Sequence, residues 1–260
     1  MSDSMQAKTP LVSSLKSYLA SRRSLLKGAV AGAAGVSGLT VAGSALLPAS
    51  TAYAATNAGG ACVDTPKTIL SVARTAERLA VTFYSNGIAH AGRLGLVGAD
   101  LENIKAALVE EQIHEIFFGA NGGVALTSDF SFPHGPDTFN NLGTFIATQQ
   151  QLEGVFDSAF LVAIREFAQL GLPALAEIAG QIATIEAEHR ALGRQIGGLT
   201  PADNWAFSPI FLPSVGAAPA LVAKAGYLSP KPGNHYTYKQ VSTADAGVIY
   251  RAPYAVGCPS

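Results

Sequence analysis

Cysteine is scarce in this chain, with two among 260 residues, and charged residues make up only 13%. Two thiols cannot build a disulfide-rich scaffold or a zinc site with four cysteine ligands. The formal net charge of −1 leaves no basic surplus for binding a phosphate backbone, which excludes nucleic acid as a partner. The sequence also lacks a glycine-rich phosphate loop, a Gly-x-Ser-x-Gly motif and a nucleophilic Cys/His setting.

The N-terminal segment has the features of an export signal. Arg22 and Arg23 are followed by Ser, two leucines and Lys27, and this run resembles the twin-arginine motif. Residues 28–47 carry no charge and are rich in glycine and alanine, and small residues precede the end of the segment at Ala54. Such a pattern predicts cleavage near Ala54 by a signal peptidase.

Export of this kind has consequences for the mature protein. We expect residues 1–54 to be removed, the twin-arginine translocation machinery to be a partner, and the protein to be periplasmic or secreted. The pathway carries folded proteins, and many of its cargoes acquire a cofactor before export. The alternative is a retained membrane anchor, since about 20 apolar residues can span a bilayer. Glycine, serine and alanine insert poorly, which favours cleavage.

Four segments of the remaining chain show the helical period, and nothing predicts a convincing strand ladder. Apolar residues recur every three or four positions over 65–90, 100–118, 142–170 and 173–196. The first segment opens on Thr65-Pro66, a capping residue followed by proline at the first helical position. We therefore expect an all-α fold with four long helices.

The lengths of the connections predict how these helices are arranged. The first and second helices are joined by a short turn, as are the third and fourth, so each pair should form an antiparallel hairpin. The irregular segment 119–141 is long enough to cross the length of a bundle. The prediction is a four-helix bundle built from two hairpins that one long crossover joins.

The C-terminal part has a different character. From residue 199 onward proline and tyrosine recur, and only 217–226 suggests a short helix. We expect 55–198 to form the bundle and 199–260 to form an irregular extension packed on it, with Trp205 and Phe207 as its anchors.

Polar residues with metal-binding chemistry interrupt the apolar face of each helix. Glu111 and His114 are three positions apart, as are Glu186 and His189, so each pair projects from one side of its helix and can chelate an ion. The other two helices each contribute one glutamate. The full set, in chain order, is Glu77, Glu111, His114, Glu153, Glu186 and His189. One glutamate from each of two helices and Glu-x-x-His from each of the others is the constellation of di-iron carboxylate bundles.

These residues identify a resemblance to a known family. Residues 65–198 resemble the ferritin-like domain of desiccation-related proteins, within the ferritin and rubrerythrin superfamily. The Phe83-Tyr84 pair six residues after Glu77 and the Ala-Glu-His stretch ending at His189 are also similar to that family. The resemblance implies a ferritin-like four-helix bundle and ligand roles for the six residues. One departure is Ala80, where such a family often has a second acidic residue.

The charge of the set predicts two metal ions. Four glutamates that face one another repel, and two divalent cations cancel their negative charge. Oxygen and imidazole ligands suit iron first, with manganese and zinc as alternatives. A site of this kind supports oxidation of Fe(II) by O₂ or breakdown of peroxide. Tyr84 could supply an electron or a hydrogen bond to the metal site. The alternative is that it is a packed core residue.

Two alternatives to a metal centre remain open at this level. The six residues could lie on solvated faces, or they could belong to a decayed site that binds no metal. Other polar groups near the motif, and the other histidines, are expected to be solvated. These are Glu110, Glu115, Glu188, His90, His134 and His235.

The two cysteines stand at opposite ends of the mature chain. Cys62 precedes the first helix and Cys258 is two residues from the C-terminus. Export would place them in an oxidising compartment, where an even pair predicts a disulfide that ties the extension to the bundle. Two free thiols are the alternative.

Three functions follow from these predictions. The first is a di-iron oxidoreductase with ferroxidase or peroxidase activity. The second is a stress- or desiccation-protective envelope protein in which the metal only stabilises the bundle. The third is association with another exported protein through the extension. A homo-oligomer is also open, and no residue identifies a substrate.

Overall fold

Residues 62–244, 247–249 and 253 are described in the computed structural model of the chain. The predicted export signal, with Arg22, Arg23 and the cleavage site near Ala54, lies outside the described residues. Cys258 also lies outside them.

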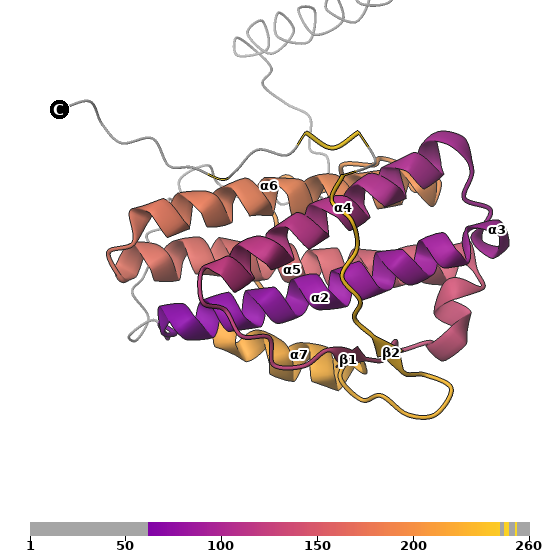
Figure 1. Cartoon of the computed structure of the whole chain (residues 1–260). Coiled ribbons are helices and arrows are strands. Elements are labelled where there is room, and N and C mark those ends of the chain that lie inside the picture. The colour runs from indigo at the N-terminus through magenta and orange to yellow at the C-terminus, as the bar shows by residue number, and fades with distance from the viewer. Residues whose placement is uncertain (1–61, 245–246, 250–252, 254–260) are drawn as a thin grey trace, which may run out of the picture. The chain divides into compact units, whose positions relative to one another are not determined.

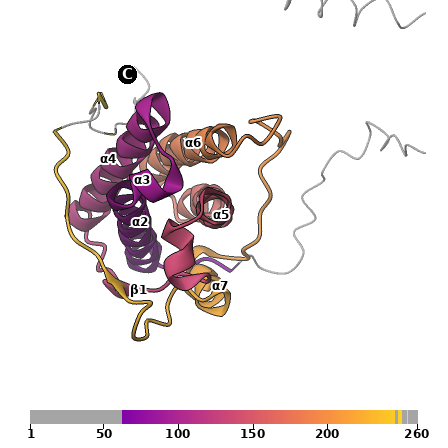
Figure 2. The same ribbon diagram turned by 90° about the vertical axis from the view of Figure 1, so that its right-hand side faces the viewer.

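Four long helices form the body of the described structure (Figure 1). They are α2 (Pro66–Ala89), α4 (Gly98–Ala120), α5 (Leu142–Gln169) and α6 (Pro173–Ile196). Helix α2 pairs with α4, and α5 pairs with α6, while α2 also adjoins α5 and α4 adjoins α6. Figure 2 shows this four-cornered arrangement along the helices. The predicted all-α bundle of two hairpins joined by a long crossover is therefore confirmed.

Local sequence signals set the helix ends. The Thr65 side chain caps α2 by accepting a hydrogen bond from the Thr68 backbone N–H at 3.2 Å, and proline occupies the first position of the helix. The Asn141 side chain caps α5 by accepting from Thr144 N–H at 3.0 Å. Helix α6 starts at Pro173 and is followed by two glycines, of which Gly198 adopts a left-handed φ of 68°. The one-turn helix α3 (Ala91–Leu94) lies between α2 and α4.

The crossover from α4 to α5 is ordered by polar and aromatic contacts. It contains β1 (Asp129–Phe130) and the 3₁₀ helix η1 (Gly135–Phe139). From α2, Arg74 donates to the Gly123 carbonyl at 2.9 Å and Arg78 donates to the Ser128 hydroxyl at 2.8 Å. These bonds give hydrogen-bond partners to polar groups of the loop that packing would otherwise leave without any, and they fix the path of the crossover.

A cluster of phenylalanines joins the crossover to the two hairpins. Phe83 of α2 stacks on Phe145 of α5 with ring centroids 4.5 Å apart, and it also meets Phe132 and Phe139 of the crossover at 5.8 and 5.9 Å. Gly87 permits this close approach, because a Cβ there would lie 2.6 Å from the Phe145 ring. Aromatic burial of this kind is a large part of the apolar stabilisation of a domain.

The C-terminal extension packs on the bundle, and it contains η2 (Val215–Ala217), α7 (Ala218–Ala225) and β2 (Tyr236–Thr237). The expected short helix over 217–226 is thus present as α7. β2 pairs antiparallel with β1, and this two-residue ladder is the only sheet in the described part of the chain.

The two expected anchors of the extension behave differently. The Trp205 ring lies under the Arg190 guanidinium of α6, 3.2 Å from ring centroid to Cζ. Phe207 was predicted to be an anchor as well, and this was wrong, because it is 91% exposed. Within 62–244, 247–249 and 253, no helix combines the length and apolarity needed to cross a bilayer.

Candidate metal centre

All six predicted ligands converge inside the bundle. Glu77 lies on α2 and Glu153 on α5, while α4 and α6 each contribute a Glu-x-x-His pair. Five of the six are almost fully buried, and the side chain of His114 is 12% exposed. Residues three apart on a helix share a face, and the packing of the two hairpins turns these faces toward each other.

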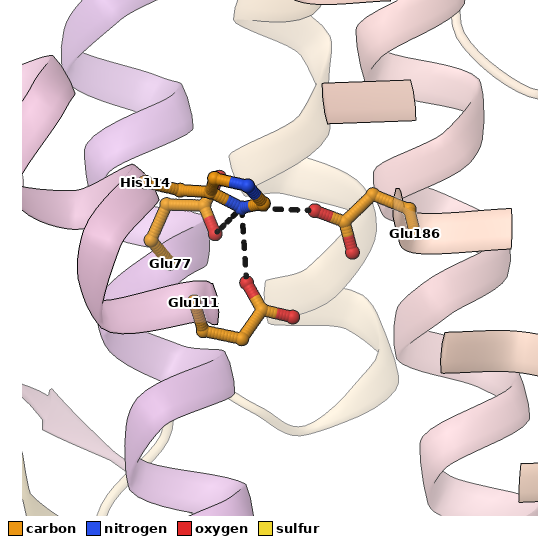
Figure 3. A group of neighbouring side chains, drawn as sticks. All are labelled: Glu77, Glu111, His114 and Glu186. Carbon is orange, nitrogen blue, oxygen red and sulfur yellow. Dashed lines mark ion pairs between the residues drawn. The ribbon is translucent and has the colours of Figure 1, made fainter. Parts of the chain in front are cut away.

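The first cluster is formed around His114 (Figure 3). Its Nδ1 atom lies 3.8 Å from Glu77 Oε2, 3.8 Å from Glu111 Oε2 and 3.7 Å from Glu186 Oε1. The four side chains come from α2, α4 and α6 and can offer one ligand atom each, with all of these atoms within 4.8 Å of one another.

The second cluster is formed around His189. Its Nδ1 atom lies 3.1 Å from Glu111 Oε1, 3.6 Å from Glu186 Oε2 and 4.0 Å from Glu153 Oε1. These four residues also satisfy the 4.8 Å spacing for a metal group. Glu111 and Glu186 belong to both clusters, with one oxygen directed to each histidine. The arrangement therefore fits two adjacent cations with two shared carboxylates.

The candidate ligand atoms are available to metal ions because most of them have no hydrogen-bond partners among the residues that the structure describes. In the described part of the chain, both carboxylate oxygens of Glu77, Glu111 and Glu186 are buried without a hydrogen-bond donor. The Nδ1 atoms of His114 and His189 also lack a hydrogen-bond partner among these residues. Buried polar atoms without partners cost free energy unless something satisfies them. Cations at the two clusters would give each of these residues a partner.

The charges of the cluster shift its ionisation. Burial raises the pKa of Glu77 well above its usual range, and the Glu111 carboxylate raises it further by repulsion. Burial likewise raises the pKa of Glu153, with repulsion from Glu186 added. Burial also opposes ionisation of Glu111, but its polar contacts with Glu77 and the two histidines outweigh that effect and lower its pKa. Without cations, these shifts favour the protonated forms of Glu77 and Glu153.

Tyr84 is a hydrogen-bonding neighbour of the centre, which is one of the roles predicted for it. Its hydroxyl donates to Glu153 Oε1 and accepts from Gln149 Nε2 at 3.2 Å. Gln149 also donates to the His189 carbonyl at 2.6 Å. Gly193 leaves room for this amide, because a Cβ there would lie 1.9 Å from Gln149 Oε1. Tyr84 and Gln149 thus link the positions of two ligands on different helices.

Two of the glutamates predicted to be surface charges are not, and both lie on α4. Glu110 is only partly exposed, and its Oε2 atom lies 2.8 Å from His189 Nε2. Glu115 is buried and forms ion pairs with Arg74 at 2.9 Å and Arg78 at 2.8 Å. Glu188 is exposed, as predicted.

The sequence held a partial signal for these two contacts. Arg74 and Arg78 are four positions apart on α2 and face the same side, which indicates an acidic partner. Nothing in α4 alone could show that Glu110 meets α6, because helix packing decides that contact. Hydrogen bonds from these ion pairs lower the pKa of Glu115 despite its burial.

The remaining predicted residues lie away from the centre. His134 and His235 are exposed, while His90 is half-buried, with its ring Nδ1 2.8 Å from the Asn86 carbonyl. Cys62 is exposed. Its proposed partner Cys258 lies outside the described residues, so the disulfide stays a prediction.

Comparison with known proteins agrees with the fold and the ligand geometry. Residues 66–198 match the model of a family described as a ferritin-like domain. No curated protein and no solved structure gave a significant match to the chain. The matched residues cover all four bundle helices and all six candidate ligands. The chain therefore belongs to the ferritin-like domain family.

Proposed function

We propose that this protein binds two metal ions, with iron as the preferred metal, and that it oxidises ferrous ions with dioxygen. The supporting observation is the pair of overlapping clusters that share Glu111 and Glu186. A buried site with two shared carboxylates brings two one-electron donors together, which suits a two-electron reduction of dioxygen. Manganese and zinc remain the alternatives by ligand chemistry, since the donor set is carboxylate oxygen and imidazole nitrogen.

The roles of the ligands follow from the two clusters. Glu77 and His114 would hold one ion, and Glu153 and His189 would hold the other. When bound, the pair of ions supplies the electrons for oxygen chemistry. With ferrous ion as substrate, two electrons pass from two Fe(II) ions to one O₂ molecule. The O₂ takes up two protons and leaves as hydrogen peroxide, and two Fe(III) ions result.

The protein's own groups prepare the site for this reaction. Glu110 Oε2 lies 2.8 Å from His189 Nε2, and a hydrogen bond donated by the Nε2–H to this carboxylate would leave the Nδ1 lone pair for the centre. The Tyr84 hydroxyl holds one oxygen of Glu153 in place. The surrounding buried aromatic and aliphatic residues exclude water, which strengthens the attraction between the carboxylates and cations.

The test is an anaerobic titration with Fe(II), followed by admission of O₂. We expect saturation at two iron ions per chain and then oxidation with release of hydrogen peroxide. Glu111→Ala and Glu186→Ala should each abolish binding of at least one ion. Glu188→Ala is the matched control, because that glutamate is exposed on α6 beside Glu186. Two ions bound by both ligand variants would contradict the ligand assignment.

A structural role for the metal is the second candidate. The six ligands lie on four different helices, so bound ions would cross-link the two hairpins. A ligand that binds only the folded state raises the stability of that state. Zn(II) cannot be oxidised by O₂, so it isolates this effect. If Fe(II) and Zn(II) both raise the melting temperature but no iron is oxidised, the protective role is favoured.

We also propose export through the twin-arginine pathway. The support is the Arg22-Arg23 motif and the charge-free segment that follows it. The experiment compares cell fractions for the full chain and the Arg22→Lys/Arg23→Lys double variant. Export of the wild type with a shortened N-terminus, and retention of the variant, is the expected result. Equal export of both would contradict the proposal.

A further inference from the structure

An apolar cavity lies inside the bundle, near the candidate metal centre. Side chains from α2, α4, α5 and α6 line it, and η2 and α7 cover it on one side. Its free volume is about 50 Å³. That is several times the roughly 10–15 Å³ that a single water molecule needs, and far below the roughly 300–1,000 Å³ of pockets for drug-sized ligands.

The lining offers no free hydrogen-bonding group among the described residues. Thr75 is its one polar side chain in that part of the chain. The Thr75 hydroxyl already donates to the Ser71 carbonyl at 2.7 Å and accepts from Leu126 N–H at 2.9 Å. A buried water needs two to four polar partners, so a cavity of this kind stays dry and accepts small apolar guests.

The cavity is about one helical turn from the metal ligands. On α2, Ala73 lines it four positions before Glu77, and Ala76 lines it next to that ligand. On α5, Phe156 lines it three positions after Glu153. On α4, lining residue Phe117 is three positions after the ligand His114. At 1.5 Å per residue these spacings correspond to roughly 5 Å along each helix.

We infer that this cavity holds dioxygen and delivers it to the metal centre. The inference rests on the proposed function, in which O₂ is the oxidant. Of the reactants, ferrous ion is charged and cannot enter an apolar cavity, because burying an unpaired charge is costly. Dioxygen is apolar, makes no hydrogen bonds that it would lose, and fits the volume. An organic substrate of ordinary size does not fit.

Xenon is the probe for the binding step, because it occupies dry apolar cavities and needs no metal. The metal-free wild type is pressurised with xenon and examined by crystallography and by ¹²⁹Xe NMR. We expect xenon between Ala73, Phe117 and Phe156. Ala159→Leu should displace it, because Ala159 lines the cavity and the added methyl groups fill it. Ala174→Leu is the matched control on an exposed position of α6.

Delivery of dioxygen to the metal centre is tested by measuring the rate of iron oxidation at several O₂ concentrations. In Ala159→Leu the O₂ concentration for half-maximal rate should rise several-fold, while two iron ions still bind. If Ala159→Leu does not fold, Ala159→Val makes the same test with less added volume. No xenon at the lining overturns the inference even if iron is oxidised. Bound xenon with an unchanged O₂ dependence in the filled variant overturns delivery.

This design separates the inference from the proposed function. If wild type oxidises no iron, the proposed function fails, and delivery of dioxygen fails with it. Absence of xenon from an active wild type leaves the function standing and removes the cavity from it.

Discussion

His189 Nε2 lies 2.8 Å from Glu110 Oε2, while the Nδ1 atom of the same ring lies 3.1 Å from Glu111 Oε1. The two nitrogens of one imidazole therefore face two adjacent glutamates of α4. A carboxylate on one ring nitrogen fixes the proton there and leaves the other nitrogen as a metal ligand. Contact between α4 and α6 thus places both ring nitrogens of His189 against carboxylates of α4, and a proton held on Nε2 by Glu110 would leave Nδ1 for a metal ion.

Glu110→Gln tests this relationship. Loss of the charged acceptor should weaken metal binding at the His189 cluster by about 10- to 100-fold, with little change at the His114 cluster. Calorimetric titration with Mn(II) would resolve one weakened and one normal class of site. Glu188→Gln, on an exposed position of α6, is the control and should match the wild type. Equal weakening of both sites would mean that Glu110 acts on the bundle as a whole.

The sharing of ligands predicts two classes of variant. Glu77 and Glu153 each belong to one cluster, so Glu77→Gln and Glu153→Gln should each leave one ion per chain. Glu111→Gln removes a carboxylate that both clusters use and should weaken both ions. Metal analysis after dialysis gives the stoichiometries. Loss of both ions in Glu77→Gln, with the fold intact by circular dichroism, would show that the two sites are not separable.

The metal-free protein should lose stability as pH rises above the ordinary range of a carboxylic acid, about 4.5. Burial raises the pKa of Glu77 and Glu153, so in this window the folded state binds protons that the unfolded state has already released. Stability rises with pH only where the unfolded state binds more protons, so here it falls. Asp157, whose pKa burial raises to about 6, contributes in the same direction.

Urea unfolding of the metal-free wild type at several pH values measures this trend. Glu77→Gln should flatten it, because the amide does not titrate. Since cations displace the retained protons, metal binding should release protons into a weakly buffered solution. A metal-free protein whose stability rises steadily to pH 8 would contradict the assigned protonation.

Glu115→Gln should destabilise the fold without changing the metal stoichiometry. This buried carboxylate accepts from Arg74 and Arg78, which also hold the crossover. Hydrogen bonds to charged groups contribute about 1.5–3 kcal/mol each, so we expect a loss of about 2 kcal/mol in the free energy of unfolding. Glu102→Gln breaks an exposed pair with Lys105 and should cost less than about 0.5 kcal/mol.

The predicted Cys62–Cys258 disulfide can be tested by mass. Intact protein isolated after export should gain two daltons on reduction if the bridge exists. Chain-entropy arguments give such a long loop a stabilisation of up to about 5 kcal/mol. The Cys62→Ser variant is the control, because it cannot form this bridge. An unchanged mass in the reduced wild type would show two free thiols.

Much of the fold could be predicted from local features. Thr65-Pro66 and Asn141 mark helix starts, and the short and long connections dictate two hairpins with a crossover. The candidate ligands could be identified as well, because Glu-x-x-His occurs twice at helical spacing within apolar faces, and the structure brings the six residues together. The burial of Glu115 and the exposure of Phe207 could not be predicted, since both depend on what another segment covers.

The sequence by itself determined the four helices, their pairing and the six candidate metal ligands, because period, caps and spacing are local properties. Only the tertiary structure decided which carboxylates are shared between the clusters, that Glu110 contacts His189, and that an apolar cavity lies among the four helices. These features arise where side chains of different helices meet. The rotation and separation of packed helices set such contacts, and no single helix encodes them.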